Sequence, residues 1–255
     1  MVGTPTPHAT EEEHHDEFYR CDASAVFDTP WFLEVRRVLA NLLMRRGRGS
    51  PQDRVLSLGC GDGRVECLMA SHVQEIVGID VSSVAIDQAR ARAAHGGLAN
   101  LRFEVGDIER LALPPASFDV IWMLGVLHHL DQPGTIKLLG RCLEILQPGG
   151  VMVSNDPSAR RLIRVFKAFV RMQYRKYHSP DERELDPHWL AKTYAAVGFN
   201  PVSICYNDFF LGPLAWLSPR GGSLVKPLSA LDSLLLAVPG VRTLASDFLV
   251  IARKP

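Results

Sequence analysis

The sequence predicts an α/β protein built on a doubly wound, mostly parallel sheet of seven strands, with an N-terminal helix and an apolar C-terminal insertion. Between Arg54 and Ser154, short apolar runs rich in β-branched residues alternate with longer segments of helical periodicity. The runs are apolar at nearly every position, as is typical of strands that helices cover on both faces. Together these observations indicate a doubly wound α/β domain.

Each element up to the fifth strand follows from a local pattern. Apolar residues from Trp31 to Leu43 recur at helical spacing and predict an amphipathic helix ahead of the sheet. The first five strands are expected over the runs RVLSL (54–58), EIVGI (75–79), LRFEV (101–105), FDVIWML (118–124) and GVMVS (150–154). Helical patterns follow the first, second and fourth runs, over Arg64–Ser71, Ser83–Ala94 and Thr135–Leu146.

The last third of the chain adds two strands and two segments that could cover the sheet's carboxyl edge. Residues 158–178 read as a basic amphipathic lid helix, and Pro187–Val197 as a helix that ends at Gly198. Strands are expected over 200–207 and 246–254. The apolar insertion between them, residues 208–245, is far longer than a hairpin loop needs.

Composition and length indicate a single domain over residues 18–255, with its core over 50–156. Residues 1–17 carry charge, Pro and Thr but little to bury, so a disordered acidic tail is expected there. The five cysteines are scattered without the spacing of a zinc or redox site, and nothing in the sequence demands a metal ion.

The 28 basic and 28 acidic side chains cancel, so no global field attracts the chain to nucleic acid. The amino terminus lacks the basic start and apolar run of a secretory signal, and a cytoplasmic location is expected. The basic face of residues 158–178 is compatible with a solvated helix and also with peripheral contact with an anionic membrane.

A glycine-rich loop, VLSLGCGDG (55–63), lies between the first strand and the first helix of the sheet. Such a loop at the carboxyl end of a strand exposes backbone N–H groups to a ligand. Asp80 ends the second strand 21 positions after Gly59, a spacing that places a carboxylate beside ribose hydroxyls. Asp107 follows the third strand and offers an acceptor for an adenine amine. The sequence therefore predicts a nucleoside site.

With these motifs in order, the chain resembles the class I S-adenosylmethionine-dependent methyltransferases over roughly residues 50–156. The matching segments are VLSLGCGDG, GIDVS, GDIERL, FDVIWMLGVLHHL and LQPGGVMV. The resemblance implies the Rossmann-like methyltransferase fold, S-adenosylmethionine as cofactor and S-adenosylhomocysteine as product. The loop runs G-x-G-x-G, whereas a nicotinamide oxidoreductase, the less favoured alternative, would need G-x-G-x-x-G.

The resemblance also implies roles for individual residues. By this resemblance, the methionine and ribose portions of the cofactor contact Gly59, Cys60, Gly61 and Gly63. The resemblance implies that Asp80 binds the ribose hydroxyls and that the backbone near Leu124 contacts the methionine amine. It also implies adenine contacts from Val81, Asp107 and Ile108. One position departs from the family: Ser57 stands where an acidic residue usually helps to hold that amine, so weaker binding or another compensating acid is expected.

Methyl transfer needs an aligned nucleophile and, where the nucleophile carries a proton, a base. His128 and His129 follow the fourth strand and are the candidate bases, with packing beside the cofactor as the alternative role. Asp156 is a second candidate base. The aromatic additions, which include Phe166 and Trp216, predict a hydrophobic or amphipathic small-molecule acceptor that is methylated on oxygen or carbon. The same fold with non-methylating chemistry, such as a cyclisation or rearrangement, is the alternative.

Overall fold

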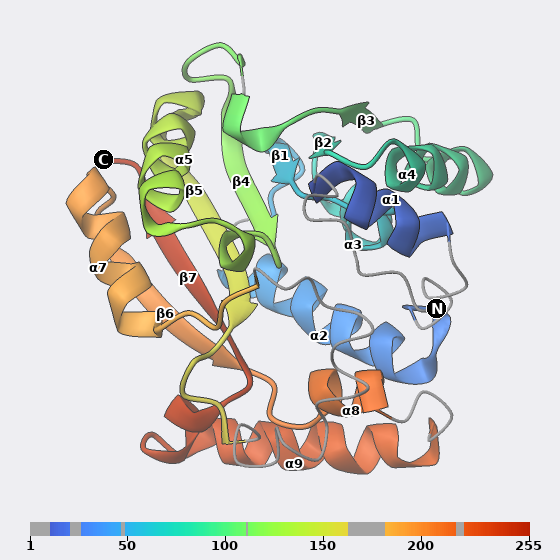
Figure 1. Ribbon diagram of the computed structural model, residues 1–255, viewed down its shortest axis with the longest axis vertical. Coiled ribbons are helices and arrows are strands. Elements are labelled where there is room, and N and C mark those ends of the chain that lie inside the picture. The colour runs from blue at the N-terminus through green and yellow to red at the C-terminus, as the bar shows by residue number, and fades with distance from the viewer. Residues whose placement is uncertain (1–10, 21–26, 47–48, 111, 163–181, 218–221) are drawn as a thin grey trace, which may run out of the picture.

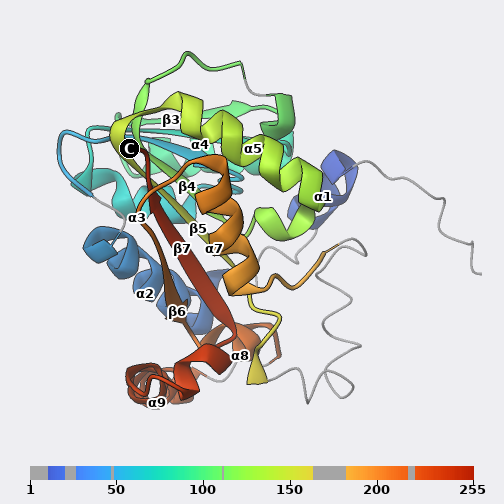
Figure 2. The same cartoon turned by 90° about the vertical axis from the view of Figure 1, so that its left-hand side faces the viewer.

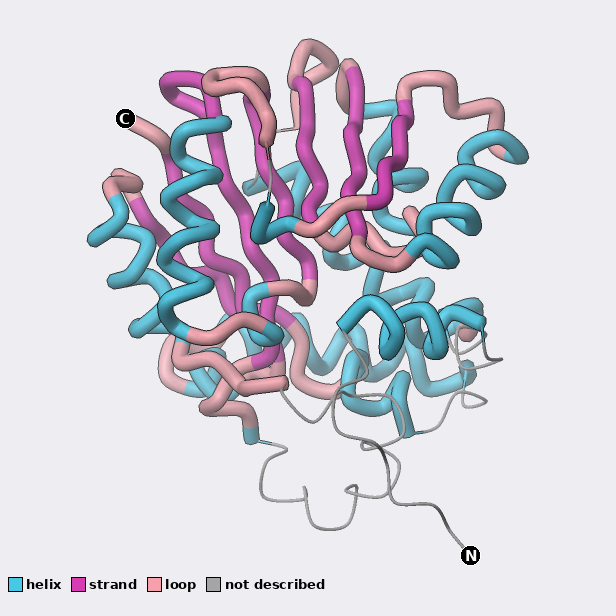
Figure 3. The backbone as a smooth tube through the Cα atoms, turned by 45° about the horizontal axis from the view of Figure 1, so that its top comes forward, coloured by secondary structure: helices cyan, strands magenta, loops and turns pink. Residues whose placement is uncertain are grey.

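The protein is built on a seven-stranded sheet with the strand order β3-β2-β1-β4-β5-β7-β6 in a computed structural model (Figure 1). The structure describes residues 11–20, 27–46, 49–110, 112–162, 182–217 and 222–255. Strands β1 to β5 pair in parallel, and β7 runs antiparallel to both β5 and β6. Figure 3 shows the strands side by side in one continuous sheet. The predicted fold class is confirmed.

The strands form where the apolar runs predict them. Their bounds are β1 Arg54–Leu58, β2 Glu75–Asp80, β3 Leu101–Val105, β4 Phe118–Leu124, β5 Leu146–Pro157, β6 Val202–Asn207 and β7 Asp247–Arg253. Alternate side chains of β1 enter different cores: Val55 packs on one face of the sheet, and Leu56 and Leu58 pack on the other. Burial on both faces explains why these strands are apolar throughout.

Helices cover both faces of the sheet (Figure 2). One core contains residues of α2 (Pro30–Arg46), α3 (Arg64–Met69) and α4 (Ser83–His95), and the other contains residues of α5 (Gln132–Ile145) and α7 (Pro187–Val197). Helix α5 starts three residues before the predicted Thr135, because the Asp131 carboxylate accepts a hydrogen bond from Gly134 N at 2.7 Å and caps the helix.

The prediction of a disordered tail over residues 1–17 is wrong for residues 11–17, which belong to helix α1 (Glu11–Arg20). The helix packs on α4, where Asp16 accepts a hydrogen bond from the Ser82 hydroxyl at 2.6 Å. Ser82 is the N-cap of α4, so the Asp16 carboxylate lies beside the positive end of that helix. This contact lowers the pKa of Asp16 and explains how an acidic segment becomes ordered.

The insertion between β6 and β7 folds into α8 (Leu211–Leu217) and α9 (Val225–Ala237), which lie with α2 at one end of the molecule (Figure 1). Trp31 and Phe32 of α2 pack there against Leu211, Ala215 and Val225. From residue 163 onward, the predicted lid helix over 158–178 lies outside the described residues, and Phe166 with it. Among the described helices, none is long and apolar enough to cross a membrane.

Candidate functional site

The glycine loop after β1 lies at the point where the strand order reverses between β1 and β4, where open α/β sheets bind ligands. Gly59 N and Cys60 N donate to Ile79 O at 2.8 and 3.2 Å and tie the loop to β2. Gly61 has φ +53°, and a Cβ there would lie 2.4 Å from the Tyr19 hydroxyl of α1. Only glycine satisfies both the backbone conformation and this close contact.

Asp80 ends β2 directly beside the loop. Its Oδ2 accepts from Gly61 N at 2.8 Å and its Oδ1 from Ser82 N at 2.9 Å. Burial raises the pKa of Asp80, an effect that these two N–H donors partly offset. Each carboxylate oxygen keeps a free lone pair, so the group is held in place and can still accept hydrogen bonds from ligand hydroxyls.

A first cavity, called here the strand-end cavity, follows the carboxyl ends of β1 to β4. Its lining includes seven of the predicted cofactor residues: Gly59, Gly61, Asp80, Val81, Asp107, Ile108 and Leu124. Asp107 accepts from Glu109 N at 2.9 Å and pairs with Arg110 at 3.2 Å, with 43% of its side chain exposed. The structure therefore brings these residues to one cavity, although their roles toward a cofactor stay predictions.

Two predicted cofactor residues lie elsewhere. Cys60 lines the neighbouring cavity, and its thiol packs beside β2, where a Cβ on Gly78 would lie 2.8 Å from the sulfur. Burial raises the pKa of this thiol, which disfavours a nucleophilic thiolate. Gly63 lines neither of the two cavities and lies at the start of α3 against Ala89 and Phe103, where it allows close packing of α3 on the sheet.

The second cavity, called here the apolar cavity, has a volume of about 400 Å³ and adjoins the first. Both cavities share lining from the glycine loop, from Leu124 and His129, and from His15 and Tyr19 of α1. An aromatic wall of Phe18, Phe27, Phe32 and Trp216 faces it, with the rings of Phe32 and Trp216 4.8 Å apart. Trp216 comes from α8, so the insertion contributes to this cavity, as predicted.

His128 lines the apolar cavity from the short 3-10 helix η4 (Leu127–His129) that follows β4. Its Nδ1 lies 3.2 Å from Oδ1 of Asp156, a fully buried residue on β5. The same carboxylate oxygen accepts from His128 N at 3.2 Å. A carboxylate at Nδ1 favours the tautomer that carries its proton there, which leaves the Nε2 lone pair available as a base. Asp156 therefore orients His128.

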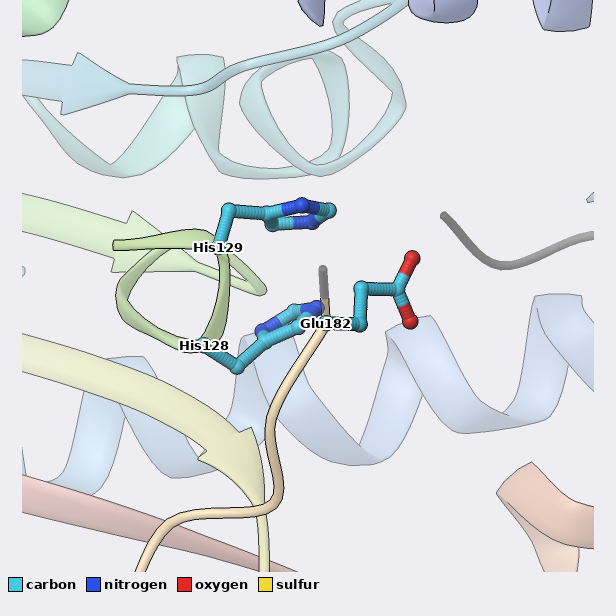
Figure 4. A group of neighbouring side chains, drawn as sticks. All are labelled: His128, His129 and Glu182. Atoms are coloured by element: carbon cyan, nitrogen blue, oxygen red, sulfur yellow. The ribbon is translucent and has the colours of Figure 1, made fainter. Parts of the chain in front are cut away.

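His129 and Glu182 complete a small cluster with His128 (Figure 4). The ring centroids of the two histidines lie 4.2 Å apart, and Glu182 approaches from the segment that precedes α7. The possible ligand atoms of the three residues lie within 4.8 Å of one another. This group can hold a cation or exchange a proton, and it lines the apolar cavity.

Comparisons with known proteins agree with this site. Residues 55–150 match the family described as "Methyltransferase domain". The chain is 32% identical over 148 residues to 27-O-demethylrifamycin SV methyltransferase of Amycolatopsis mediterranei, which covers 57% of this chain and 51% of that protein. It is 30% identical over 116 residues to ubiquinone biosynthesis O-methyltransferase of Coxiella burnetii, covering 46% of each. Residues 55–150 therefore carry a methyltransferase domain, in agreement with the predicted resemblance to the class I S-adenosylmethionine-dependent methyltransferases.

The methyl donor of this family is S-adenosylmethionine, as the motifs predicted. The fold also matches phosphoethanolamine N-methyltransferase 2 of Haemonchus contortus, solved with S-adenosylmethionine. The TM-score is 0.67 at 18% identity, and the match covers 99% of this chain and 61% of that one. The chain spans about half the length of the rifamycin and ubiquinone relatives that it matches.

Three residues that line these cavities carry no sequence motif. His15 belongs to the segment predicted as a tail, and Glu182 lies more than fifty positions after the histidines that it approaches. Glu66 of α3 is buried at 2% exposure and accepts a hydrogen bond from the Ser57 hydroxyl at 2.6 Å. The departure at Ser57 predicted either weaker cofactor binding or a compensating acid, and did not locate such an acid.

Proposed function

We propose that this methyltransferase transfers the methyl group of S-adenosylmethionine to an oxygen or carbon atom of a hydrophobic or amphipathic small molecule. One observation carries the proposal: an acidic, glycine-rich cavity at the strand ends adjoins an apolar cavity, and the two share the glycine loop and His129. A cofactor whose nucleoside lies in the strand-end cavity and whose methionine portion reaches the shared boundary would meet an acceptor in the apolar cavity there, as direct transfer requires.

The residues at the strand ends fit the cofactor. The Asp80 carboxylate is anchored by Gly61 N and Ser82 N, and its remaining lone pairs suit the two hydroxyls of a ribose. Val81 and Ile108 offer apolar contacts, and Asp107 offers an acceptor for an exocyclic amine. The cofactor supplies a sulfonium that activates its own methyl group, so the protein has mainly to align the acceptor and exclude water.

The acceptor class follows from the apolar cavity. Its volume of about 400 Å³ lies within the range of small-molecule sites, and its aromatic wall favours a flat or extended apolar ligand. The names of the two relatives, a demethylrifamycin methyltransferase and a ubiquinone O-methyltransferase, both refer to organic small molecules and support the same class. Nucleic acid is a poor candidate, because the chain's net charge is zero.

His128 is the proposed base. When an acceptor hydroxyl attacks the methyl carbon, the carbon–sulfur bond breaks and the hydroxyl proton must leave. Nε2 of His128 would take this proton, and the Asp156 carboxylate at Nδ1 would stabilise the imidazolium that forms. The proton then passes to solvent, and the cofactor leaves as the neutral thioether S-adenosylhomocysteine.

The proposal is tested by incubating the protein with methyl-labelled S-adenosylmethionine and an organic extract of the source cells, followed by mass analysis. Label in an apolar product that requires the intact protein supports methyl transfer. The His128→Asn variant is run in parallel and should give far less labelled product while still binding S-adenosylhomocysteine. Cofactor binding without label in any acceptor would favour the non-methylating alternative, and absence of cofactor binding would contradict the proposal.

A further inference from the structure

Glu66 is a buried carboxylate that the proposed mechanism leaves unexplained. It lines the apolar cavity beside the glycine loop and is 2% exposed. Its Oε1 accepts from the Ser57 hydroxyl at 2.6 Å, whereas Oε2 is buried and has no hydrogen-bond partner among the described residues. Because a buried oxygen without a donor is costly, this geometry calls for a ligand that supplies one.

The surroundings of Glu66 determine the charge of that ligand. The carboxylates of Asp62 and Asp80 and the thiols of Cys60 and Cys67 lie close enough to interact with it electrostatically. Burial, together with the two aspartates, raises the pKa of Glu66 to about 7. An acidic, desolvated group of this kind favours a cation with N–H donors.

The nearest arginines are engaged elsewhere. Arg64 and Arg92 donate to Asp62 at 2.5 and 3.2 Å, and Arg64 also pairs with Asp28. Arg36 lines the same cavity, but its guanidinium donates to Phe27 O at 2.6 Å and lies 4.7 Å from the centre of the Phe27 ring. None of these contacts supplies a donor to Glu66 Oε2, so among the described residues no arginine occupies this position, and a cationic ligand can fill it.

We propose that Glu66 binds the α-ammonium group of the cofactor's methionine portion, with Ser57 as the hydroxyl that holds the carboxylate in place. The inference rests on the proposed function, because it assumes that S-adenosylmethionine occupies the site. Oε2 accepts an N–H of the ammonium group, and Oε1 stays hydrogen-bonded to Ser57. The acid that binds the cofactor amine thus lies on α3, one element after the strand that carries Ser57.

Ammonium binding by Glu66 makes cofactor binding release protons. With a pKa of about 7, Glu66 is about half protonated at neutral pH in the free protein. The ammonium group pairs with the ionised carboxylate, so the complex favours the deprotonated form. Binding at pH 7 should therefore release about half a proton from this group, and the Glu66→Gln variant should lack that release.

The test is isothermal titration calorimetry with S-adenosylhomocysteine, which lacks the sulfonium charge, and with its analogue lacking the α-amino group. The Glu66→Gln variant should bind S-adenosylhomocysteine about 10- to 100-fold more weakly than the native protein. The native protein should bind the analogue more weakly than S-adenosylhomocysteine by a similar factor, whereas the variant should bind the two ligands about equally. Glu75→Gln is the matched control, because Glu75 starts β2 and pairs with Arg54 and Arg102.

Proton release is measured in the same titrations by repeating them in buffers of different ionisation enthalpy. Release that is present in the native protein and in Glu75→Gln but absent from Glu66→Gln supports the inference. Equal affinity of the native protein for both ligands, or unchanged proton release in Glu66→Gln, overturns it while leaving the proposed function intact. If the native protein binds neither ligand, both proposals fail. If the Glu66→Gln variant does not fold, the inference is still tested by the native protein's affinities for the two ligands and by its proton release.

Discussion

Replacing Glu66 with Gln should change how the stability of the unliganded protein depends on pH. Glu66 is 2% exposed, and burial raises its pKa from the ordinary 4.5 to about 7. Because the folded state holds this proton more tightly than the unfolded state, the unfolded state binds fewer protons between these two pKa values. The free energy of unfolding should therefore fall as the pH rises from about 4.5 to about 7, and this contribution should be constant above that window.

The size of the effect follows from the shift. A difference of about 2.5 pH units at about 1.4 kcal/mol per unit gives a loss of roughly 3 kcal/mol over the whole window. The amide of the Glu66→Gln variant cannot ionise and is close in shape to the protonated carboxyl, so the variant should lack this contribution. Between about pH 5 and pH 8, the native protein should lose about 2 to 3 kcal/mol relative to Glu66→Gln.

The assay is urea unfolding of both proteins across this pH range, with free energies compared at each pH. Asp247, another buried acid with a raised pKa, is present in both proteins and cancels in the difference. If the free energies of unfolding of the two proteins differ by the same amount at every pH in this range, the conclusion that Glu66 is a buried, uncompensated carboxylate is refuted.

Two predictions concern the apolar cavity. Trp216→Ala removes part of the aromatic wall, so the KM for an apolar acceptor should rise about 10-fold while the Kd for S-adenosylhomocysteine stays unchanged. A changed Kd for S-adenosylhomocysteine with an unchanged acceptor KM would instead indicate that Trp216 contacts the cofactor. His128→Asn removes the proposed base, so steady-state kinetics with a hydroxyl acceptor should show kcat lowered by roughly 100- to 10,000-fold, and calorimetry should show unchanged cofactor affinity. Full activity of this variant at neutral pH would exclude His128 as the base.

The fold and the cofactor loop could be predicted because their signals are local. The apolar runs of β1 to β5 identify buried strands, and Gly59, Gly61 and Asp80 lie within one strand–loop–helix–strand unit. Strand β5 (Leu146–Pro157) extends beyond its predicted run at both ends. Leu146 pairs with Phe118 of β4, and at the other end the antiparallel pairing with β7 continues as far as Pro157. That pairing partner lies about ninety positions away, and no local pattern encodes it.

The residues that sequence reasoning missed depend on tertiary contacts. Helix α1 has a composition typical of disorder, and its order depends on tertiary contacts such as that between Asp16 and the N-terminus of α4 and that between Tyr19 O and the Gln88 side chain. In the sequence, Glu66 has no feature that distinguishes it from an exposed acidic residue of a helix. Its burial against Ser57 is evident only in the folded structure. The serine itself was the available signal, because the missing acid at that position predicted either weaker cofactor binding or a compensating acid elsewhere in the chain.

The affinity of Asp80→Ala for S-adenosylhomocysteine tests whether the glycine loop and Asp80 bind the nucleoside of the cofactor. The substitution removes the acceptor of both Gly61 N and Ser82 N and the proposed acceptor of the ribose hydroxyls. Calorimetry should show a loss of about 100-fold or more, with Asp87→Ala on the exposed face of α4 binding as the native protein does. Unchanged affinity in a folded Asp80→Ala protein would show that this carboxylate does not bind the cofactor's ribose.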